Sequence, residues 1–548
     1  MLRLLLLVLL LAPVALAQDP RVDSVVNAAS YTPSALPGGG LGQGSMVIIF
    51  GVNLGPGQIL IVSAFPLPLE MGGTSARITM GATTVRAIMI YTLASQVAII
   101  IPSNTPLGNG TLVLTYNGRN SAAFPVRIVR ATFGIFALNQ AGSGQGIFTD
   151  PDFRVNSLVL AARPTTVWIA WGTGMGAVAG DEAGGVLPGD MVNANVVVIA
   201  GGKRARIIYR GRSGCCAGID QIAFEVPEGI EGCYVPVVVL VNDVPSNYVT
   251  MSVASQGTVC ADSTGFNSTD LTGAQSRGSL RVGTISLDRS SFSITIPMVG
   301  TLDSKTDTGS ASFLQYDASN LLAARQFAGN ITLGACIVFT FSGTAQVDPI
   351  RPVFLDAGRI MVTGPRGTKE LTRVSTGVYS ETLGGGTPSI PGVPGPAPAP
   401  DFLEPGNYRI TGSGATVGSF EVNLGIGAPL NWTNRDSINS VPLSQPLTVA
   451  WTGGDAARDT VQIFGTSSLS SARVVAGFIC QERVGAGRFT IPVEVLAALP
   501  ASEVDSGVPT GTLIVGTFGN TVRFQASGLD AGFALHMSSS GKLVNYTR

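Results

Sequence analysis

The six cysteines have the clearest chemistry in this chain, and they fall into two groups along the sequence. The groups are Cys215, Cys216, Cys233 and Cys260, and then Cys336 and Cys480. A zinc site would need Cys-x2-4-Cys spacing, which the adjacent pair in the first group lacks. An even number of cysteines in a chain that begins with an export signal, described below, favours disulfides instead.

Pairing inside the two groups leaves 3 arrangements, because four cysteines can be joined in three ways. We favour the bonds Cys216–Cys233, Cys215–Cys260 and Cys336–Cys480. A bond between the adjacent Cys215 and Cys216 is the strained alternative. A loop closed by Cys216 and Cys233 would stabilise the fold by roughly 3 kcal/mol through restriction of the unfolded chain.

His536 is the single histidine of the chain. Any Ser-His-Asp or Cys-His mechanism would therefore have to use it. The sequence has no Gly-x-Ser-x-Gly elbow and no His-Glu-x-x-His motif, and one histidine cannot form a multi-histidine metal centre. We expect no catalytic, cofactor-binding or metal-binding residue, and we interpret His536 as an ordinary exposed or core residue.

Two groups of carboxylates could in principle do chemistry, since oxygen-rich loops hold calcium and carboxylate pairs hydrolyse glycosidic bonds. Asp181 and Glu182 lie in a Gly-rich loop, and Asp303 and Asp307 flank Lys305 in an expected turn. Neither group shows the Asp-x-Asp-x-Asp-Gly ladder of a calcium loop. We expect solvated turns, while a glycosidase pair distant in sequence stays open.

Tryptophans can stack on sugar rings, and the chain has four of them. Trp168 and Trp171 lie three apart on an expected strand, so their side chains should point to opposite faces. At least one should then belong to the core of the domain. Trp432 and Trp451 lie in similar apolar segments. For these tryptophans we favour a place in the core over a place on an exposed surface that binds sugars.

An internal repeat organises the first half of the chain. The segment from Gln96 to Pro102 matches that from Gln221 to Pro227, each a Gln-x5-Pro strand. The same offset relates further landmarks, namely Asn117 and Ser121 to Asn242 and Ser246. A shared offset indicates duplication. Because proline cannot donate to a strand ladder, we interpret the motif as a strand end in preference to a binding motif.

Each copy of the repeat reads as about seven short strands bounded by Gly, Pro or Asn. In the first copy they are expected near 45–51, 59–63, 75–80, 84–91, 96–101, 110–116 and 122–129. Seven strands in roughly 110 residues suit an immunoglobulin-like (Ig-like) sandwich. The predicted fold class is all-β, with tandem Ig-like β-sandwiches followed by a β-rich C-terminal unit.

The predicted organisation follows from the repeat and from changes in composition. It comprises sandwich repeats at 18–130 and 131–255, a polar linker at 256–275 and a β-rich unit at 276–548, which has a Pro-rich linker or loop at 384–406. The C-terminal unit should have two β-rich halves and one short helix at 492–499, and alternating stretches at 280–297, 408–424, 447–451 and 460–464 support strands.

The first 17 residues have the order of a cleavable signal peptide. Arg3 precedes an apolar run that is too short for a permanent anchor, and Ala15-Leu16-Ala17 supplies a cleavage site. We expect a secreted, extracellular or periplasmic protein that does not span a membrane after cleavage. The net charge of −1 without a basic cluster argues against nucleic acid as a partner.

Several ordered motifs carry a resemblance to a known family. They are Val26-Asn27-Ala28-Ala29-Ser30-Tyr31, the segment 44–51, Phe133-Gly134-Ile135-Phe136, the two Gln-x5-Pro strands and the segment 244–249. Over about residues 22–255 the chain resembles secreted Ig-like repeat proteins that are expanded in Acidobacteria of the Solibacter type and related to IPT/TIG-like modules. The resemblance implies an extracellular or envelope pair of β-sandwiches of uncharacterised function, with no catalytic residue to carry over.

These observations favour a bacterial, non-enzymatic surface or secreted protein that acts in adhesion or in binding an extracellular ligand, either a glycan or a protein. An alternative from another class is a secreted enzyme acting on polysaccharide, with Asp and Glu chemistry in the C-terminal half. A passive structural spacer is the third hypothesis.

Overall fold

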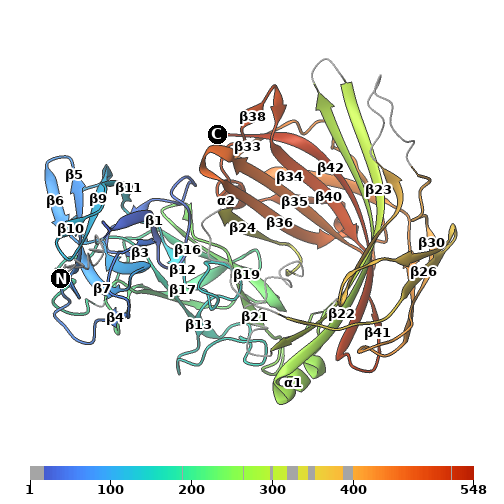
Figure 1. The fold of residues 1–548 in the computed structure, drawn as a ribbon, viewed down its shortest axis with the longest axis horizontal. Helices are drawn as coiled ribbons and strands as arrows, with labels where there is room; N and C mark the ends of the chain where they lie inside the picture. Colours follow the sequence, from blue (N-terminus) through green and yellow to red (C-terminus); the bar gives the residue numbers. More distant parts are fainter. Residues whose placement is uncertain are drawn as a thin grey trace, which may run out of the picture.

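The computed structural model describes residues 18–548 except 188, 263–264, 297–299, 318–330, 343–351, 387–398 and 520. The predicted signal peptide at 1–17 and most of the Pro-rich segment at 384–406 lie outside the described residues. In the described part, strands dominate and α-helices are confined to two short segments (Figure 1). The fold is all-β, as predicted. No helix of this part is long and apolar enough to cross a membrane.

The first repeat is an Ig-like sandwich of two sheets. One sheet has the order β1-β3-β8-β7-β4, and the other has β2-β11-β9-β5-β6 with β10 beside β9. Alternate residues such as Val47 and Ile49 are fully buried between the sheets. The strands are β1 Arg21–Asn27, β2 Leu41–Gly42, β3 Met46–Val52, β4 Leu60–Ile61, β5 Thr74–Met80, β6 Thr83–Arg86, β7 Ile88–Thr92, β8 Gln96–Ile100, β9 Gly108–Tyr116, β10 Arg119–Asn120 and β11 Phe124–Val129.

One expected strand of this repeat, at 84–91, is divided between the two sheets. β6 pairs with β5, whereas β7 pairs with β8. The chain changes sheet at Ala87, whose side chain is buried. The alternation of apolar and polar residues does not show where a chain passes from one sheet to the other. The sequence therefore predicted a single strand here.

The second repeat repeats this architecture with its two sheets joined by β17. The first residues of β17 pair with β16 and the later ones with β18. The sheet order is β12-β14-β18-β17-β16-β19-β20, with β13, β15 and β21 at its sides. The strands are β12 Gly134–Ile135, β13 Phe148–Thr149, β14 Val167–Thr173, β15 Gly189–Asp190, β16 Val196–Ala200, β17 Lys203–Arg212, β18 Asp220–Glu225, β19 Gly232–Val241, β20 Val244–Pro245 and β21 Val249–Val253.

A buried ion cluster joins the two repeats. Arg212 contacts the carboxylates of Asp220 and Glu182, and Glu182 accepts a hydrogen bond from the Ser103 backbone N–H of the first repeat at 2.8 Å. The expectation that Glu182 belongs to a solvated turn is wrong, since its side chain is 6% exposed. The Arg212 guanidinium supplies the opposite charge that lets this carboxylate be buried.

The connector at 256–275 is more ordered than its polar composition predicts. Helix α1 Ser268–Arg277 begins with a capping box formed by Asn267 and Asp270. Cys260 and Phe266 are buried in a small core that also contains residues of the C-terminal unit. A few apolar side chains, placed by a disulfide, are enough to pack this segment although its overall composition is that of a linker.

The disulfides are Cys215–Cys216, Cys233–Cys260 and Cys336–Cys480. The third bond is one that we favoured, whereas the other two favoured bonds are wrong. The loop that contains Cys215 and Cys216 packs against the first repeat through Gly218. Cys233 and Cys260 instead share the small core beside the C-terminal unit. Spacing along the chain could not reveal that these pairs lie at opposite ends of the second repeat.

The C-terminal unit is built on one twelve-stranded sheet with the main order β24-β36-β35-β40-β42-β22-β23-β29-β28. β22 and β23 form a hairpin with 18 residues in each strand, and β42 runs parallel to β22 (Figure 1). The strands are β22 Ser279–Ile296, β23 Gly300–Asp317, β24 Ala335–Ser342, β25 Val353–Phe354, β28 Arg373–Ser375, β29 Val378–Gly386, β33 Ser440–Pro442, β35 Thr460–Leu469, β36 Val474–Arg483, β40 Gly511–Phe518, β41 Val522–Phe524 and β42 Ala531–Thr547.

Two smaller sheets cover separate parts of one face of this long sheet. Ala534 packs in one core and Tyr546 in the other, and both point to the same side of β42. The sheets are β27-β26-β30-β31 and β32-β34-β37. Their elements, with helix α2 and a small hairpin, are β26 Ile360–Gly364, β27 Gly367–Leu371, β30 Gly406–Gly412, β31 Phe420–Ile426, β32 Leu430–Trp432, β34 Leu447–Gly453, β37 Arg488–Ile491, α2 Val493–Leu496, β38 Val504–Asp505 and β39 Val508–Pro509.

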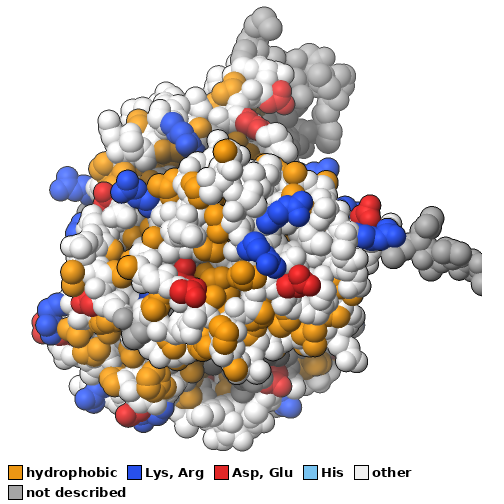
Figure 2. All heavy atoms as spheres, turned by 90° about the vertical axis from the view of Figure 1, so that its left-hand side faces the viewer, with side chains coloured by type: hydrophobic (Ala, Val, Ile, Leu, Met, Phe, Trp, Pro, Cys, Tyr) orange, Lys and Arg blue, Asp and Glu red, His pale blue; other side chains and the backbone are white. Residues whose placement is uncertain are grey.

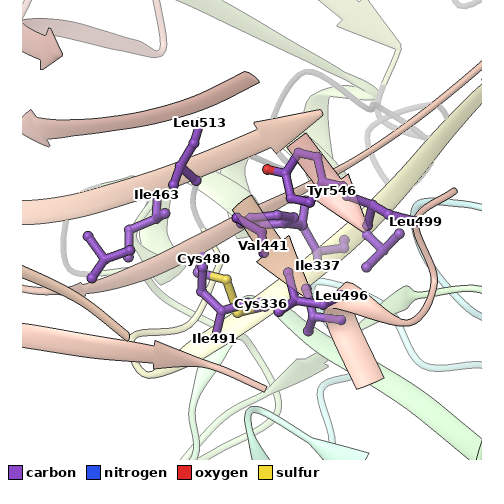
Figure 3. Packing of buried hydrophobic residues seen from close by; sticks show 14 of the residues in the cluster. Cys336, Ile337, Val441, Ile463, Cys480, Ile491, Leu496, Leu499, Leu513 and Tyr546 are labelled. Carbon is purple, nitrogen blue, oxygen red and sulfur yellow. A yellow bond between two sulfur atoms is a disulfide. The ribbon is translucent and has the colours of Figure 1, made fainter. Parts of the chain in front are cut away.

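The second of these cores encloses the Cys336–Cys480 disulfide. Figure 3 shows the bond between β24 and β36, surrounded by aliphatic side chains and close to Leu496 of α2. α2 lies inside the helix predicted at 492–499. Leu36, Val238 and Tyr248 of the two repeats also belong to this core. The repeats are therefore packed against the C-terminal unit.

Candidate functional site

The two glutamines of the repeated motif occupy equivalent places, each opposite an aromatic residue. Gln96 begins β8 and is the cross-strand partner of Phe50 in β3. Gln221 lies in β18 and is the partner of Trp171 in β14. The prolines, Pro102 and Pro227, follow the ends of β8 and β18. The proline thus stands where a strand ends, while the glutamine adjoins a ring.

A second ring lies beside the first in each repeat. The Tyr31 and Phe50 ring centroids are 6.3 Å apart with an interplanar angle of 37°. The Phe153 and Trp171 centroids are 6.1 Å apart with an angle of 44°. Such tilted, close pairs form rigid aromatic surfaces. The two repeats therefore carry the same ring pair with different residue types.

Tyr31 and Phe153 share an unusual backbone conformation. Their φ angles are +54° and +62°, in the left-handed region that side chains with a Cβ rarely adopt. Asn27 holds the turn before Tyr31, and its Oδ1 accepts hydrogen bonds from two following backbone N–H groups. Asp150 plays the same part before Phe153, since its Oδ1 also accepts from two backbone N–H groups. Both repeats thus build a capped turn that places an aromatic side chain.

A tyrosine completes the set in each repeat. Tyr91 of β7 is the partner of Ala98, and Tyr209 of β17 is the partner of Ala223, each directly after a bulge in its strand. Burial and the neighbouring Tyr31 raise the pKa of Tyr91 to about 12. Its hydroxyl therefore stays protonated near neutral pH and can donate a hydrogen bond.

These residues lie on the outer face of each sandwich. In β8, Val97 and Ile99 point into the core, so Gln96 points outward. In β14, Trp168 is 5% exposed, whereas Trp171 is half-buried on the other face. This confirms the opposite orientation predicted for the two tryptophans. We call the set Tyr31, Phe50, Tyr91 and Gln96 the first aromatic face, and the set Phe153, Trp171, Tyr209 and Gln221 the second aromatic face.

The second aromatic face is held firmly and is more accessible. The Trp171 Nε1–H donates to Thr149 Oγ1 at 2.9 Å, which fixes the indole. The Phe153 side chain is 65% exposed. Burial would raise the pKa of Asp150 beneath it, but hydrogen bonds from Arg154 lower that pKa below its usual value. The turn therefore has an ionised anchor and presents Phe153 to the solvent.

Both glutamine side chains are available to a ligand. No hydrogen bond of the Gln96 or Gln221 side-chain amide is found within the described residues. Each amide can therefore donate and accept. Charges are sparse on the end of the molecule that the first repeat forms, where hydrophobic side chains lie between scattered charged ones (Figure 2). Rings with an unengaged amide can stack and form hydrogen bonds, but they provide no nucleophile.

Sequence reasoning found part of this site. It identified Gln96 and Gln221 by their motif, but it assigned them a structural part only. Matching aromatic types at a nearly constant offset were the missed signal for the rings. The other candidate residues, the six cysteines, lie elsewhere as disulfides. Among the described residues, no three His, Cys, Asp or Glu side chains gather as a metal site.

Comparison with known proteins adds little beyond the geometry. No protein-family model matches the chain, and no curated protein matches it. SGBP-B from a complex xyloglucan utilization locus in Bacteroides uniformis shows 10% identity over 70% of this chain and 89% of its own, with a TM-score of 0.16. The I9–I11 tandem of titin shows 6% identity over 70% and 93%, with a TM-score of 0.12.

A third solved structure, domains 5–6 of the S-layer protein SbsC, shows 11% identity over 43% of this chain and 100% of its own, with a TM-score of 0.18. Scores this low do not establish a common arrangement of whole chains. The all-β architecture is established by the strands and their pairing in this protein.

Proposed function

We propose that this chain is a non-enzymatic binding protein that presents two equivalent saccharide-binding faces, one on each Ig-like repeat. The observation that carries the proposal is the recurrence of three rings and a glutamine at matching places on the outer surface of both repeats. Core packing does not require rings there, because the core side of the same strands is already filled by other apolar residues.

The chemistry of the two faces suits a sugar. A pyranose ring has an apolar C–H surface that stacks on an aromatic ring, and its hydroxyls need partners that both donate and accept. A glutamine amide supplies both functions. Rigid aromatic side chains also lose little conformational entropy when a ligand binds. Each face would then contact one or two sugar units of a longer chain.

The absence of enzymatic activity is part of this proposal. Tyr91 is kept protonated by its raised pKa, and the rings and amides contain no general base or nucleophile. Two faces on one chain would raise the apparent affinity for a polymer, because the second contact becomes intramolecular. That advantage suits adhesion to a glycan more than turnover of it.

Export and family membership belong to the proposal as well. The signal-like segment at 1–17 and three disulfides support a protein that works outside the cytoplasm. The ordered motifs in 22–255 support a place among secreted Ig-like repeat proteins of the Solibacter type.

The test uses Trp171 as a built-in reporter. The other three tryptophans are between 3% and 6% exposed, so ligand-induced changes in fluorescence should come from Trp171. The full mature chain is titrated with xylohexaose, cellohexaose and mannohexaose. We expect at least one of them to change the emission with saturation. Phe153→Ala should weaken that binding about tenfold, as expected for loss of one stacking contact of about 1–3 kcal/mol.

Val155→Ala is the matched control, because Val155 lies two residues away, is 42% exposed and belongs to neither face. Equal binding by Phe153→Ala and Val155→Ala would contradict the proposal. Binding to protein partners but to no member of a glycan array would favour a protein ligand. Release of reducing ends from a glycan would favour the enzyme alternative, and absence of every ligand would favour the spacer.

A further inference from the structure

A cleft of about 350 Å³ opens in the C-terminal unit where the two covering sheets part. Its floor is a row of cross-strand partners on the long sheet: Arg289 of β22, Ser538 of β42 and Thr517 of β40. His536 lies two positions before Ser538 and therefore points to the same face. The walls come from β30, β31 and the loop 454–459. This site is separate from both aromatic faces.

Both arginines that line the cleft have carboxylate partners, whereas the lining carboxylate Asp459 accepts the Asp455 backbone N–H at 3.0 Å. Arg289 donates from Nε and Nη2 to the two carboxylate oxygens of Asp307, at 2.7 Å each. Arg458 on the rim donates from Nε to Asp455 at 2.6 Å. Asp307 was expected in a solvated turn. That expectation is wrong, because it lies in β23 and its side chain is 0% exposed. The arginine opposite it makes this burial possible.

The imidazole of His536 is a polar group on this floor that has no hydrogen-bond partner among the described residues. Burial and the nearby Arg289 lower its pKa to about 4, while Asp307 acts in the opposite direction. The neutral imidazole has one donor and one acceptor nitrogen. Ser538 and Thr517 contribute hydroxyls that also donate and accept.

We propose that this cleft binds a small neutral polyhydroxylated molecule, such as a monosaccharide or disaccharide. Its volume falls in the range of small-molecule sites. A neutral ligand matches a lining whose arginines already have carboxylate partners, whereas an anionic ligand would lose its hydration without gaining a free positive counter-charge. Hydroxyl groups match the mixed donors and acceptors of His536, Ser538 and Thr517. The proposal does not rest on the aromatic faces.

The test measures ligand binding in the cleft through the NMR signal of the His536 imidazole. His536 is the only histidine of the chain, so histidine-labelled, tag-free mature protein gives one imidazole signal in NMR spectra. Glucose, xylose, mannose and cellobiose are titrated beside the anionic sugar glucuronate. We expect at least one neutral sugar to shift the His536 signal with saturation, and glucuronate to bind at least tenfold more weakly. Equal or tighter binding of glucuronate would overturn the proposal, as would no shift with any neutral sugar.

Adjacent serines provide matched variants. Ser538 points into the cleft, whereas Ser539 points to the opposite face of the same strand. Ser538→Val should weaken the neutral sugar at least tenfold, and Ser539→Val should leave its affinity unchanged. Ser538→Ala, which adds no bulk, serves if the valine variant fails to fold by circular dichroism. Equal affinity of the two serine variants would overturn the site. Trp171 lies outside the cleft. Its fluorescence response to oligosaccharides therefore tests the aromatic faces independently of the His536 signal, which tests the cleft.

Discussion

Ser121 and Ser246 make the same side-chain hydrogen bonds in the two repeats. Ser121 Oγ accepts from the Leu114 backbone N–H at 3.0 Å, and Ser246 Oγ accepts from the Val239 backbone N–H at 3.0 Å. Each hydroxyl then donates to the carbonyl of the residue that follows it, at 2.9 and 2.7 Å. The duplication read from the sequence thus extends to single hydrogen bonds.

This equivalence predicts equal losses of stability. Ser121→Ala and Ser246→Ala should each lower the free energy of unfolding of their repeat by about 1–3 kcal/mol, because a buried backbone N–H loses its acceptor. Chemical denaturation followed by hydrogen exchange in each repeat measures the loss. Ser95→Ala, at an exposed position, should change nothing. A large loss in one repeat and none in the other would show that the two serines are not equivalent.

Phe153 allows the backbone strain at its position to be compared with the contribution of its ring to ligand binding. Its φ of +62° suits glycine, and its side chain is largely exposed. Phe153→Gly should therefore leave the second repeat unchanged or stabilise it by about 1 kcal/mol. The same variant should bind the oligosaccharide about tenfold more weakly, as Phe153→Ala should, measured by Trp171 fluorescence. A destabilised Phe153→Gly protein would instead show that the ring is needed for packing.

Much of the fold could be predicted because short-range sequence patterns determine it. Alternation and turn residues gave the strands of the first repeat, and a constant offset between motifs gave its second copy. Long-range choices were not accessible in this way. The change of sheet at Ala87 and the pairing of Cys233 with Cys260 depend on which segments meet in space. The order within the connector depends on the same packing.

Only part of the candidate site could be identified from the sequence, for a similar reason. Gln96 and Gln221 stood out because their spacing to proline repeats. The rings beside them come from other strands and turns, and only pairing across the sheet brings Phe50 or Trp171 next to its glutamine. Asp307 was assigned to a solvated turn and His536 was treated as an ordinary residue, because the row that joins Arg289, Ser538 and Thr517 exists only in the folded sheet.

The Arg289–Asp307 pair should support the whole C-terminal hairpin. Asp307 also accepts hydrogen bonds from the backbone N–H groups of Phe402 and Leu403, at 2.7 and 2.8 Å. Asp307→Asn leaves Arg289 with only the more distant carboxylate of Asp401, at 3.7 Å, and it should lower the free energy of unfolding of this unit by about 3 kcal/mol. Denaturant unfolding measures the change. Asp303→Asn on the exposed part of the same strand is the control and should have a small effect.

His536 should make the C-terminal unit sensitive to mild acid. Its folded pKa of about 4 lies below its ordinary value of 6.5, so the unfolded state binds more protons between these two pH values. The stability that His536 confers is therefore complete above about pH 6.5 and is lost as the pH falls toward 4. Denaturation at a series of pH values measures this slope, and His536→Gln should remove its contribution. An NMR titration midpoint near 6.5 for the folded protein would contradict the mechanism.

The three disulfides should contribute different amounts to the free energy of unfolding, because they close loops of different length. The chain-entropy relation gives about 5 kcal/mol for the 144-residue separation of Cys336 and Cys480, and about 3.5 kcal/mol for the 27-residue separation of Cys233 and Cys260. The adjacent Cys215 and Cys216 close no loop of comparable length. Double alanine variants should therefore lose stability in this order, with the vicinal pair losing least.

Denaturant unfolding of the oxidised proteins measures the order, and hydrogen exchange assigns each loss to a unit. The Cys336→Ala/Cys480→Ala protein should exchange faster in β24 and β36, which that bond joins. The Cys233→Ala/Cys260→Ala protein should exchange faster around α1, since Cys260 anchors the connector in its small core. If removal of the vicinal bond caused the largest loss instead, the loop at 213–218 would matter to the contact between the repeats more than chain entropy predicts. Reduction of that bond would then loosen the two aromatic faces relative to one another.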